Sequence, residues 1–339
     1  MNSLLAKYSG KKILITGHTG FKGTWLSRIL VLAGAQVYGL SLEAEKNSLF
    51  SKIENLGIKE SSILDIRDRA GVENYFKSHS FDGIFHLAAQ PLVRRSYREP
   101  IETFDTNVMG TAHVLNSVVS SNAANWAVVI TTDKVYRNVE KLEGYAEDEP
   151  LGGKDPYSAS KAGTEMVVSA WQTLASQSDK KISICAARAG NVIGGGDTAE
   201  DRLIPDLIRG FHAKSKTLIR NPESIRPWQH VLDPLNGYLT IGVNLMEGKK
   251  ISPAYNFGPG EESKLTVQEM ATYACSQWPE SLGIEIKVDP TAVPESGLLW
   301  LSSDLATKEL GWRNRFEAQE AIAWTIEWER ESMSSTPLL

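Results

Sequence analysis

Tyr157 and Lys161 are a pair of residues whose types and spacing suggest chemistry. A separation of four residues places both side chains on one face of a helix. Tyrosine titrates near pH ~10, but a neighbouring ammonium group and a positive nicotinamide ring would both favour its phenolate. Such a group can take the proton of a substrate hydroxyl while hydride leaves the carbon. We interpret the pair as catalytic; the alternative is an ordinary surface pair, because this spacing is common by chance.

A second possible acid/base pair follows the apolar run 127–131, which reads as a strand. The carboxyl end of a parallel strand faces the crevice where ligands bind. There Thr132 could hydrogen-bond a substrate hydroxyl, Asp133 could protonate a leaving hydroxyl, and Lys134 could remove a carbon-bound proton. Alternatively, Asp133 is a turn residue or cap and Lys134 is a solvated side chain. A plain dehydrogenase needs no such pair, so the stretch indicates that something besides hydride moves.

Gly17, Gly20 and Gly23 have the spacing of a dinucleotide-binding loop. The three glycines serve a tight turn, close approach of the backbone to pyrophosphate, and close packing of helix on strand. The pyrophosphate then lies at a helix N-terminus, where N–H groups favour anions. The loop follows a predicted strand, 12–16, and precedes a predicted helix, 24–33, which is the context that the motif requires. The alternative is a glycine-rich turn without a ligand.

The choice between NAD and NADP rests on the end of the second predicted strand, 36–40. An acid usually binds the adenosine ribose there, but this chain has Ser41, with Glu43 two residues further on. No arginine adjoins Ser41 to hold the extra phosphate of NADP, so we favour NAD. Lys22 could contact phosphate or be a solvated surface lysine. Asp65, at the end of the predicted third strand, either meets the adenine or caps a helix.

The elements that position these residues alternate between strands and helices. This order predicts an α/β fold with a Rossmann-type, doubly wound parallel sheet and a smaller, mixed α/β C-terminal substrate domain. We expect residues 1–187, with 229–257 returning to them, to form the dinucleotide-binding domain, and 188–228 with 258–339 to form the substrate-binding domain. The other expected strands are 62–65, 83–87 and 182–187, and the other expected helices are 100–120, 156–173, 202–213 and 231–246. We expect 222–227 to be irregular.

Composition narrows the class of protein. The chain has 339 residues and a net charge of −5, without a basic patch that would suit nucleic acid or an anionic membrane. Its two cysteines have no metal-site spacing and form no secreted disulfide framework, which favours the reducing cytoplasm. Residues 1–12 are polar and lack the apolar core of a signal peptide. The scattered His18, His86 and His230 suggest core or supporting roles, and we predict no metal.

Taken together, these motifs resemble the extended short-chain dehydrogenase/reductase superfamily over nearly the whole chain. Within it, four blocks resemble the CDP-glucose 4,6-dehydratase family: 18–26, 90–94, 132–136 and 225–231. The resemblance implies these NAD contacts: Gly17, Thr19, Gly20, Phe21, Lys22, Gly23, Ser41, Asp65, Ile66, Leu87, Ala88, Ala89, Asn107, Thr131, Tyr157 and Lys161. It implies these substrate contacts, with arginines suited to diphosphate: Gln90, Arg94, Asn191, Leu203, Ile204, Arg226 and His230.

The resemblance also implies a reaction. Tyr157 would take the proton of the 4-hydroxyl of CDP-glucose, Lys134 would be the base at C5, and Asp133 would help the 6-hydroxyl to leave as water. Sister dehydratases carry Glu where this chain has Lys134. A lysine with a pKa near ~10.4 is a poor base, so burial beside Lys161 would have to lower that pKa, or water or Tyr157 would share the step. The product would be used for deoxysugars of a surface polysaccharide.

Partners and rival functions follow from the same resemblance. The helices expected at 100–120 and 156–173 match those that form a four-helix dimer interface in the superfamily, so we expect a homodimer, with a tetramer as the alternative. The nearest rival function is a nucleotide-sugar 4-epimerase, which needs no acid at Asp133; a dehydratase of another nucleotide sugar is also open. A non-enzymatic dinucleotide-binding protein would be expected to have lost Tyr157 or Lys161, and both are present.

Overall fold

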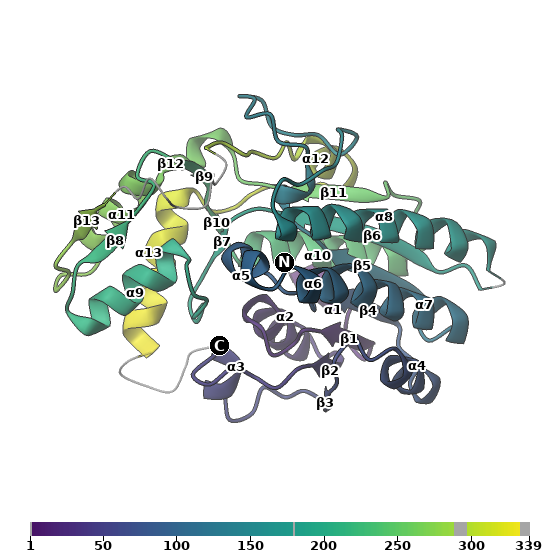
Figure 1. The fold of residues 1–339 in the computed structure, drawn as a ribbon. Coiled ribbons are helices and arrows are strands. Elements are labelled where there is room, and N and C mark those ends of the chain that lie inside the picture. Colours follow the sequence, from purple (N-terminus) through teal and green to yellow (C-terminus); the bar gives the residue numbers. More distant parts are fainter. Residues whose placement is uncertain (1, 179, 288–296, 333–339) are drawn as a thin grey trace.

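A seven-stranded parallel sheet forms the centre of the computed structural model, which describes residues 2–178, 180–287 and 297–332 (Figure 1). Every neighbouring pair in it is parallel. This confirms the predicted doubly wound α/β fold. Across the sheet the strands are β11 (Ala254–Phe257), β6 (Ser183–Ala189), β5 (Trp126–Ile130), β4 (Gly83–His86), β1 (Lys12–Thr16), β2 (Gln36–Ser41) and β3 (Glu60–Ile63).

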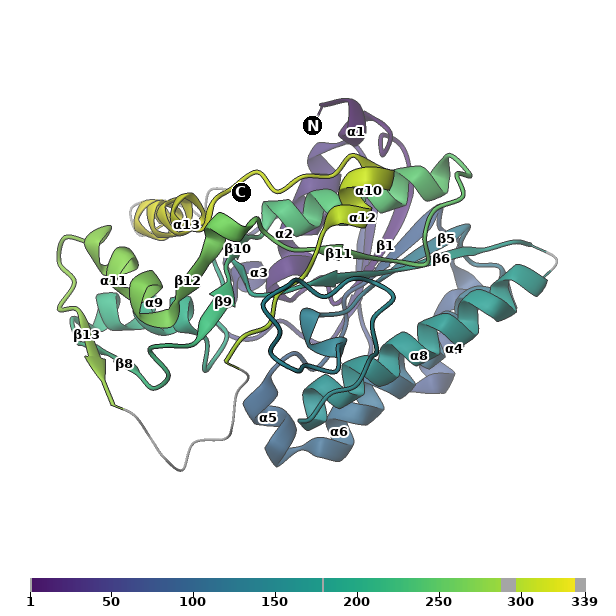
Figure 2. The same ribbon diagram turned by 90° about the horizontal axis from the view of Figure 1, so that it is seen from above.

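Helices cover both faces of the sheet, and each face has its own apolar core (Figure 2). One core is closed by α2 (Phe21–Leu32), α10 (Leu232–Met246) and α12 (Asp304–Leu310). The opposite core is closed by α4 (Arg69–Ser78), α7 (Thr111–Ser121) and α8 (Pro156–Gln177). Because both faces are covered, the central strands β4 and β5 are buried along their whole length.

A second, smaller core lies beside the sheet and is built by the later part of the chain. It joins the apolar faces of α9 (Leu203–Ala213), α11 (Val267–Ser276) and α13 (Ala318–Ser332). Short two-stranded pairs complete this part: β7 (Val192–Ile193) with β10 (Gln229–His230), β8 (Thr217–Ile219) with β13 (Ile284–Ile286), and β9 (Ile225–Pro227) with β12 (Lys264–Thr266). Figure 1 shows this unit at one side of the sheet.

The remaining elements are short and lie mainly at the carboxyl edge of the sheet and at its flanks. They are α1 (Asn2–Ala6), α3 (Leu49–Lys52), α5 (Val93–Arg98), α6 (Pro100–Phe104), the π-helix η1 (Asp105–Gly110), and the 3₁₀ helices η2 (Asp133–Val135) and η3 (Glu261–Ser263). No helix in the three described ranges is both long and apolar enough to cross a membrane.

Several expected elements differ in detail. The N-terminal segment is not merely a polar lead-in, because it forms α1 and buries Tyr8 completely. The segment 222–227 is not all irregular, because β9 pairs with β12. The helix expected at 100–120 is interrupted by the π-turn of η1. The helix expected to begin at residue 24 begins at Phe21, because Gly20 is its cap, and the third strand ends two residues early, at Ile63.

Candidate active site

The glycine loop lies between β1 and α2 and has the geometry that a pyrophosphate requires. Gly17 has a φ of 74°, and a Cβ there would lie 2.8 Å from the backbone nitrogen of Ala88. A Cβ at Gly23 would lie 2.1 Å from the Gly17 carbonyl oxygen. Gly20 is different, because a Cβ there would meet only that same oxygen, at 3.4 Å. It caps α2 without any side-chain hydrogen bond, so the first N–H groups of the helix suit an anion.

Thr19 and Lys22, which lie between the glycines of the loop, have different surroundings. The Thr19 hydroxyl is 2.7 Å from that of Ser41 and thereby ties the loop to the end of β2. Lys22 is not a solvated surface lysine, since its Nζ lies 5.9 Å from the ring centre of buried Tyr238. Burial, followed by the charges of Arg202 and Lys161, lowers the pKa of Lys22 to about 7. Lys22 therefore points toward the reaction centre.

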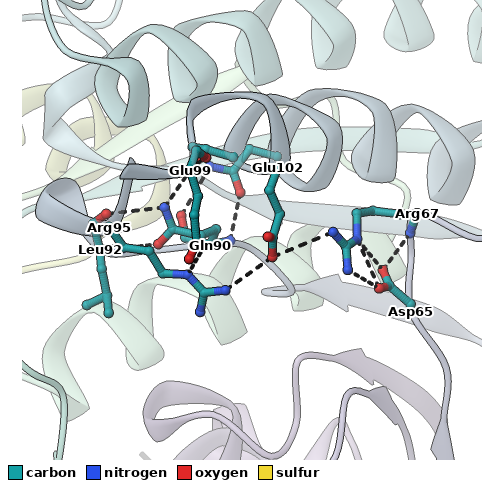
Figure 3. Close-up of polar contacts among 9 residues, drawn as sticks. Asp65, Arg67, Gln90, Leu92, Arg95, Glu99 and Glu102 are labelled. Atoms are coloured by element: carbon teal, nitrogen blue, oxygen red, sulfur yellow. Dashed lines mark hydrogen bonds and ion pairs between the residues drawn. The ribbon is translucent and has the colours of Figure 1, made fainter. Parts of the chain in front are cut away.

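Asp65 does not cap the helix that follows, and its expected contact with the adenine stays a prediction. Its carboxylate accepts from the backbone of Arg67 at 2.9 Å and pairs with that residue's guanidinium at 2.6 Å (Figure 3). The bond with Arg67 holds the pKa of Asp65 below its usual value. The helix cap is Asp68, which accepts from Gly71. Asp65 is one end of a charged chain that continues through Arg67 to Glu102 of α6.

Gln90 and Asn107 use their side chains to hold the loop after β4. The Gln90 amide donates to Thr103 at 2.9 Å and accepts from the Leu92 backbone at 2.6 Å (Figure 3). The Asn107 amide accepts from the Gln90 backbone at 2.8 Å and donates to Ser160 of α8 at 2.9 Å. Both amides are buried and engaged. They therefore position the loop, and the expected contacts of Gln90 with substrate and of Asn107 with cofactor stay predictions.

The end of β5 carries Thr132, Asp133 and Lys134 into the short helix η2. Asp133 is 1% exposed, and its Oδ1 accepts from the Thr132 hydroxyl at 2.8 Å. Its Oδ2 is buried and has no hydrogen-bond partner among the residues that the structure describes. The space beside that oxygen is kept by Gly190, where a Cβ would lie 3.1 Å from it. Lys134 is not buried as the base hypothesis required: its side chain is 30% exposed, and its Nζ lies 3.7 Å from Asp133 Oδ1.

Tyr157 and Lys161 project from the first turns of α8 toward the same place. The helix begins at Pro156 because Asp155 caps it, accepting from the Ser158 backbone at 2.9 Å. Burial raises the pKa of Tyr157 to about 12, and a hydrogen bond with Thr132 opposes this. Burial lowers the pKa of Lys161 to about 8, and its Nζ donates to the Ile130 carbonyl at 3.3 Å. Burial is thus the largest influence on the pKa of both residues.

The chain is similar in sequence to proteins of known activity. A family model described as "GDP-mannose 4,6 dehydratase" matches residues 14–325. The chain belongs to this family. The CDP-glucose 4,6-dehydratase of Salmonella typhimurium is 43% identical over 95% of this chain and 91% of its own length. A UDP-glucose 4-epimerase of Pisum sativum is 26% identical over 96% of this chain and 97% of its own.

Solved structures give the same fold for this member of the GDP-mannose 4,6-dehydratase family. An NAD-dependent NDP-hexosamine 5,6-dehydratase of tunicamycin biosynthesis is 25% identical, with a TM-score of 0.77 over 95% of this chain and 98% of that one. A dTDP-glucose 4,6-dehydratase of Streptomyces venezuelae, solved with NAD, is 24% identical, with a TM-score of 0.79 over 95% of this chain and 98% of that one.

Sequence reasoning missed a buried network that supports the site of this family member. Arg188 of β6 donates from two nitrogens to the Glu165 carboxylate, at 2.9 Å each. The Thr131 hydroxyl donates to Glu165 at 2.5 Å. Glu165 follows Lys161 by one helical turn, so a charged series on one face of α8 was the signal available in the sequence. The network fixes α8 against the ends of β5 and β6.

The other expected cofactor contacts lie around the glycine loop or in the core. The Leu87 and Ala88 backbones are bonded to Thr16, at 3.1 and 3.2 Å. Ile66 is 4% exposed and packs in the core under α4 and α7. The remaining two occupy loop and helix-start positions: Phe21 opens α2 and Ala89 follows β4.

The expected substrate residues are divided between the two parts of the molecule. Arg94 lies on α5 and pairs with Asp201 at 3.2 Å, whereas Arg226 lies on β9 and donates to the Ile225 carbonyl at 3.0 Å. Ile204 belongs to the second core, 3% exposed, with Leu203 packed at its edge. The remaining two are Asn191, which precedes β7, and His230, which packs on Phe316 and whose pKa burial lowers to about 4.

Proposed function

We propose that the protein is an NAD-dependent 4,6-dehydratase that converts CDP-D-glucose to CDP-4-keto-6-deoxy-D-glucose and water. The observation that carries this proposal is Asp133: a buried carboxyl group with one oxygen bonded to Thr132 and the other without a partner, at the end of β5 beside Tyr157. A dehydration needs an acid at that place. The 43% identity to a CDP-glucose 4,6-dehydratase supports the choice of substrate.

The first part of the reaction is oxidation at C4, and we assign it to Tyr157, Thr132 and Lys161. Tyr157 takes the proton of the 4-hydroxyl, with Thr132 fixing the phenol and Lys161 supplying positive charge from the next turn of α8. Bound NAD would supply the acceptor for hydride from C4 and the source of hydride for C6. The glycine loop and the N-terminus of α2 would hold its pyrophosphate, and Ser41 at the end of β2 is placed for the adenosine ribose.

Loss of water requires a base at C5 and an acid at the 6-hydroxyl. Once C4 is a ketone, the C5 proton becomes acidic. Because the Lys134 side chain is 30% exposed rather than buried, we infer that Lys134 removes this proton together with water or Tyr157. The carboxyl group of Asp133 gives its proton to the departing hydroxyl. Because Lys134 Nζ lies only 3.7 Å from Asp133 Oδ1, the proton taken from C5 can return to the carboxylate for the next turnover.

A 4-epimerase on the same fold is the nearest alternative, and Asp133 argues against it. An epimerase rotates its keto-sugar and returns hydride to C4, so it needs no acid that expels a hydroxyl. A buried acid with an unpartnered oxygen would be a cost without a use in such an enzyme. We further infer that the product enters deoxysugar synthesis for a surface polysaccharide, and that the enzyme works in the cytoplasm.

We also propose that the protein forms a homodimer through the helical face that carries 100–121 and α8. Five large apolar side chains are exposed on these helices: Ile101 by 75%, Met166 by 56%, Leu174 by 50%, Met109 by 48% and Phe104 by 40%. A second copy of the face would remove them from water. Sedimentation analysis of the wild type and of I101D tests this: a monomeric wild type would contradict it. A tetramer would require a further contact.

The division of the chain into two domains fits the same scheme. We propose that 1–187 with 229–257 binds the dinucleotide, since β11 pairs with β6 and α10 packs on the first core. The segments 188–228 and 258–339 would then bind the sugar nucleotide. Of these, 288–296 and 333–339 lie outside the described residues.

The decisive experiment offers the purified protein CDP-glucose, dTDP-glucose and GDP-mannose separately, with and without added NAD. Mass spectrometry follows the loss of one water. Loss from CDP-glucose alone is the expected result, and its dependence on added NAD reports how tightly the cofactor is held. Inversion at C4 without water loss would establish the epimerase instead, and loss from another nucleotide sugar would correct the substrate.

A further inference from the structure

Tyr136 directly follows the short helix η2, which carries Asp133 and Lys134, and its side chain lies in the interior of the protein. It is 1% exposed. Its hydroxyl donates to Asn256 Oδ1 and accepts from a guanidinium nitrogen of Arg188, both at 2.7 Å. Burial raises the pKa of Tyr136 well above its ordinary value, so the group stays a neutral phenol. It is therefore suited to hold a position rather than to exchange a proton with the substrate.

Both partners of this hydroxyl are themselves held in place. Asn256 of β11 and Arg188 of β6 lie opposite each other in the register of these parallel strands. Asn256 is completely buried, and its amide nitrogen donates to the Tyr145 carbonyl at 2.8 Å. Arg188 is fixed by two bonds to Glu165, which use nitrogens other than the one that binds Tyr136. The place of the Tyr136 hydroxyl is thus set by the sheet.

The hydrogen bonds within η2 are long by comparison. The Lys134 backbone nitrogen lies 3.4 Å from the Thr132 hydroxyl oxygen. The Tyr136 backbone nitrogen lies 3.5 Å from the Asp133 carbonyl oxygen, whereas such bonds are typically about 2.9 Å long. Gly152 adds one backbone bond of 2.8 Å to the end of the helix. Because a single turn with weak internal bonds does not fix its own orientation, contacts with other elements must do so.

The bond of Tyr136 acts more directly on the groups assigned to water loss than on those assigned to oxidation. Asp133 and Lys134 lie on η2 itself, immediately before Val135 and Tyr136. Tyr157 instead projects from α8. Removal of the Tyr136 hydroxyl would leave the two bonds between Arg188 and α8 unbroken, because they use other nitrogens. The two halves of the reaction should therefore respond differently to its loss.

We propose that Tyr136 is a positioning residue for dehydration: by binding Arg188 and Asn256, its hydroxyl sets the orientation of η2 and of the acid and base that η2 carries. This deepens the proposed function and rests on it. Tyr136 is not itself catalytic, since protein groups engage its hydroxyl both as donor and as acceptor. A displacement of ~1 Å at a reacting group can lower a rate by about 100-fold, which is the scale of effect that a misplaced η2 would produce.

Two matched variants each remove one buried hydroxyl. Y136F takes away the oxygen and keeps the ring, which is stacked on that of Tyr145. Y255F is the control, because Tyr255 precedes Asn256 on β11 and is also buried, and its hydroxyl also has two partners. Side chains alternate along a strand, so Tyr255 points to the opposite face of the sheet, away from Asn256.

The measurement compares the two halves of the reaction in each variant, with CDP-glucose as substrate and added NAD. Stopped-flow absorbance of the nicotinamide follows oxidation at C4. Mass spectrometry follows exchange of the C5 proton with deuterated water and loss of water. A merely structural role would lower both rates in parallel, because less of the enzyme would be folded.

In Y136F we expect C5 exchange and water loss to slow by about tenfold to 100-fold, while oxidation at C4 stays within about twofold of the wild-type rate. In Y255F both rates should stay within about twofold of the wild type. Equal losses, unchanged rates or a larger loss of oxidation in Y136F would each overturn the proposal. If Y136F does not fold, N256L gives the same comparison, since it removes the acceptor of the same hydrogen bond.

The assay also distinguishes failure of this inference from failure of the proposed function. If the wild type expels water from CDP-glucose and Y136F keeps the wild-type ratio of the two rates, the function stands and Tyr136 is not a positioning residue. If water is lost from dTDP-glucose or GDP-mannose instead, the ratio is measured with that substrate. If the wild type expels water from none of the three, the proposed function is wrong, and the inference falls with it.

Discussion

Glu165 and Arg188 form a two-point ion pair inside the protein, with both distances 2.9 Å and both side chains 5% exposed or less. Each charge would be costly to bury alone, and the pair is completed by the Thr131 hydroxyl. Because Glu165 lies one turn after Lys161, its negative charge also raises the pKa of that lysine, against the larger effect of burial. The ion pair thus links β6 to the face of α8 that carries Lys161.

Opposite pH shifts are expected when the two partners are changed. E165Q removes the charge that keeps Lys161 protonated, so the alkaline limb of kcat/KM should move to lower pH. R188Q leaves the Glu165 charge uncompensated, so the limb should move to higher pH. The other charged groups near Lys161 are Lys22 and, only when protonated, His86. Shifts in the same direction would indicate a purely structural pair, and E73Q on the surface of α4 is the control.

Asp133→Asn should separate oxidation from dehydration. The amide keeps the size of the carboxyl group but cannot give a proton to the 6-hydroxyl. We expect water loss to fall by about 100- to 10,000-fold, while oxidation at C4 persists and is seen as nicotinamide absorbance after mixing enzyme, NAD and CDP-glucose. If the D133N enzyme lost water at the wild-type rate, the acid would have to be another group.

Lys134→Met tests the base. The side chain is part-exposed and pairs with Asp133, so its loss should not unfold the protein. We expect the substrate to be oxidised at C4 but to exchange its C5 proton with deuterated water at least about 100-fold more slowly. Exchange at full rate, measured by mass spectrometry, would transfer the role to water or Tyr157.

Two glycines of the same loop should behave differently when changed to alanine. Gly17 has a φ of 74° and would place Cβ 2.8 Å from the Ala88 backbone, so G17A should lower the free energy of unfolding by more than about 1 kcal/mol. G20A meets nothing nearer than 3.4 Å, so it should fold normally and bind NAD more weakly. Thermal melting and NAD titration measure the two effects. Unchanged NAD affinity in G20A would argue against the pyrophosphate site.

Buried histidines should make the protein sensitive to acid. His86 is hydrogen-bonded to Thr16 and Thr111, and burial lowers its pKa from 6.5 to about 3. Between about pH 3 and 6.5, the imidazole of His86 is protonated in the unfolded chain but neutral in the native state. The free energy of unfolding therefore falls as the pH falls below 6.5. H86Q should therefore reduce the slope of unfolding free energy against pH, between about pH 4 and 6, by about 1.4 kcal/mol per unit. An unchanged slope in urea titrations would show that His86 is protonated without unfolding.

The order of strands and helices could be predicted because the chain's periodicity is local. The apolar runs that form β1, β4 and β5 are short, are buried on both faces and are separated by helices. This pattern predicts a doubly wound parallel sheet. The glycine spacing and the Tyr157/Lys161 pair were visible for the same reason, since each motif lies within one turn or one loop. The π-turn around Asn107 was not visible, because its amide is satisfied by Gln90 and Ser160, which are distant in sequence.

The sequence by itself determined which groups could do chemistry, since residue type and helical spacing place Tyr157, Lys161 and Asp133 near one strand edge whatever else the chain does. Only the tertiary structure decided the state of those groups. Burial by segments far along the chain raises the pKa of Tyr157 and lowers those of Lys161 and Lys22. Pairings such as Glu165 with Arg188, or Asp201 with Arg94 and Arg220, join separate elements. Desolvation and ion pairing depend on distances in space, which spacing along a chain does not contain.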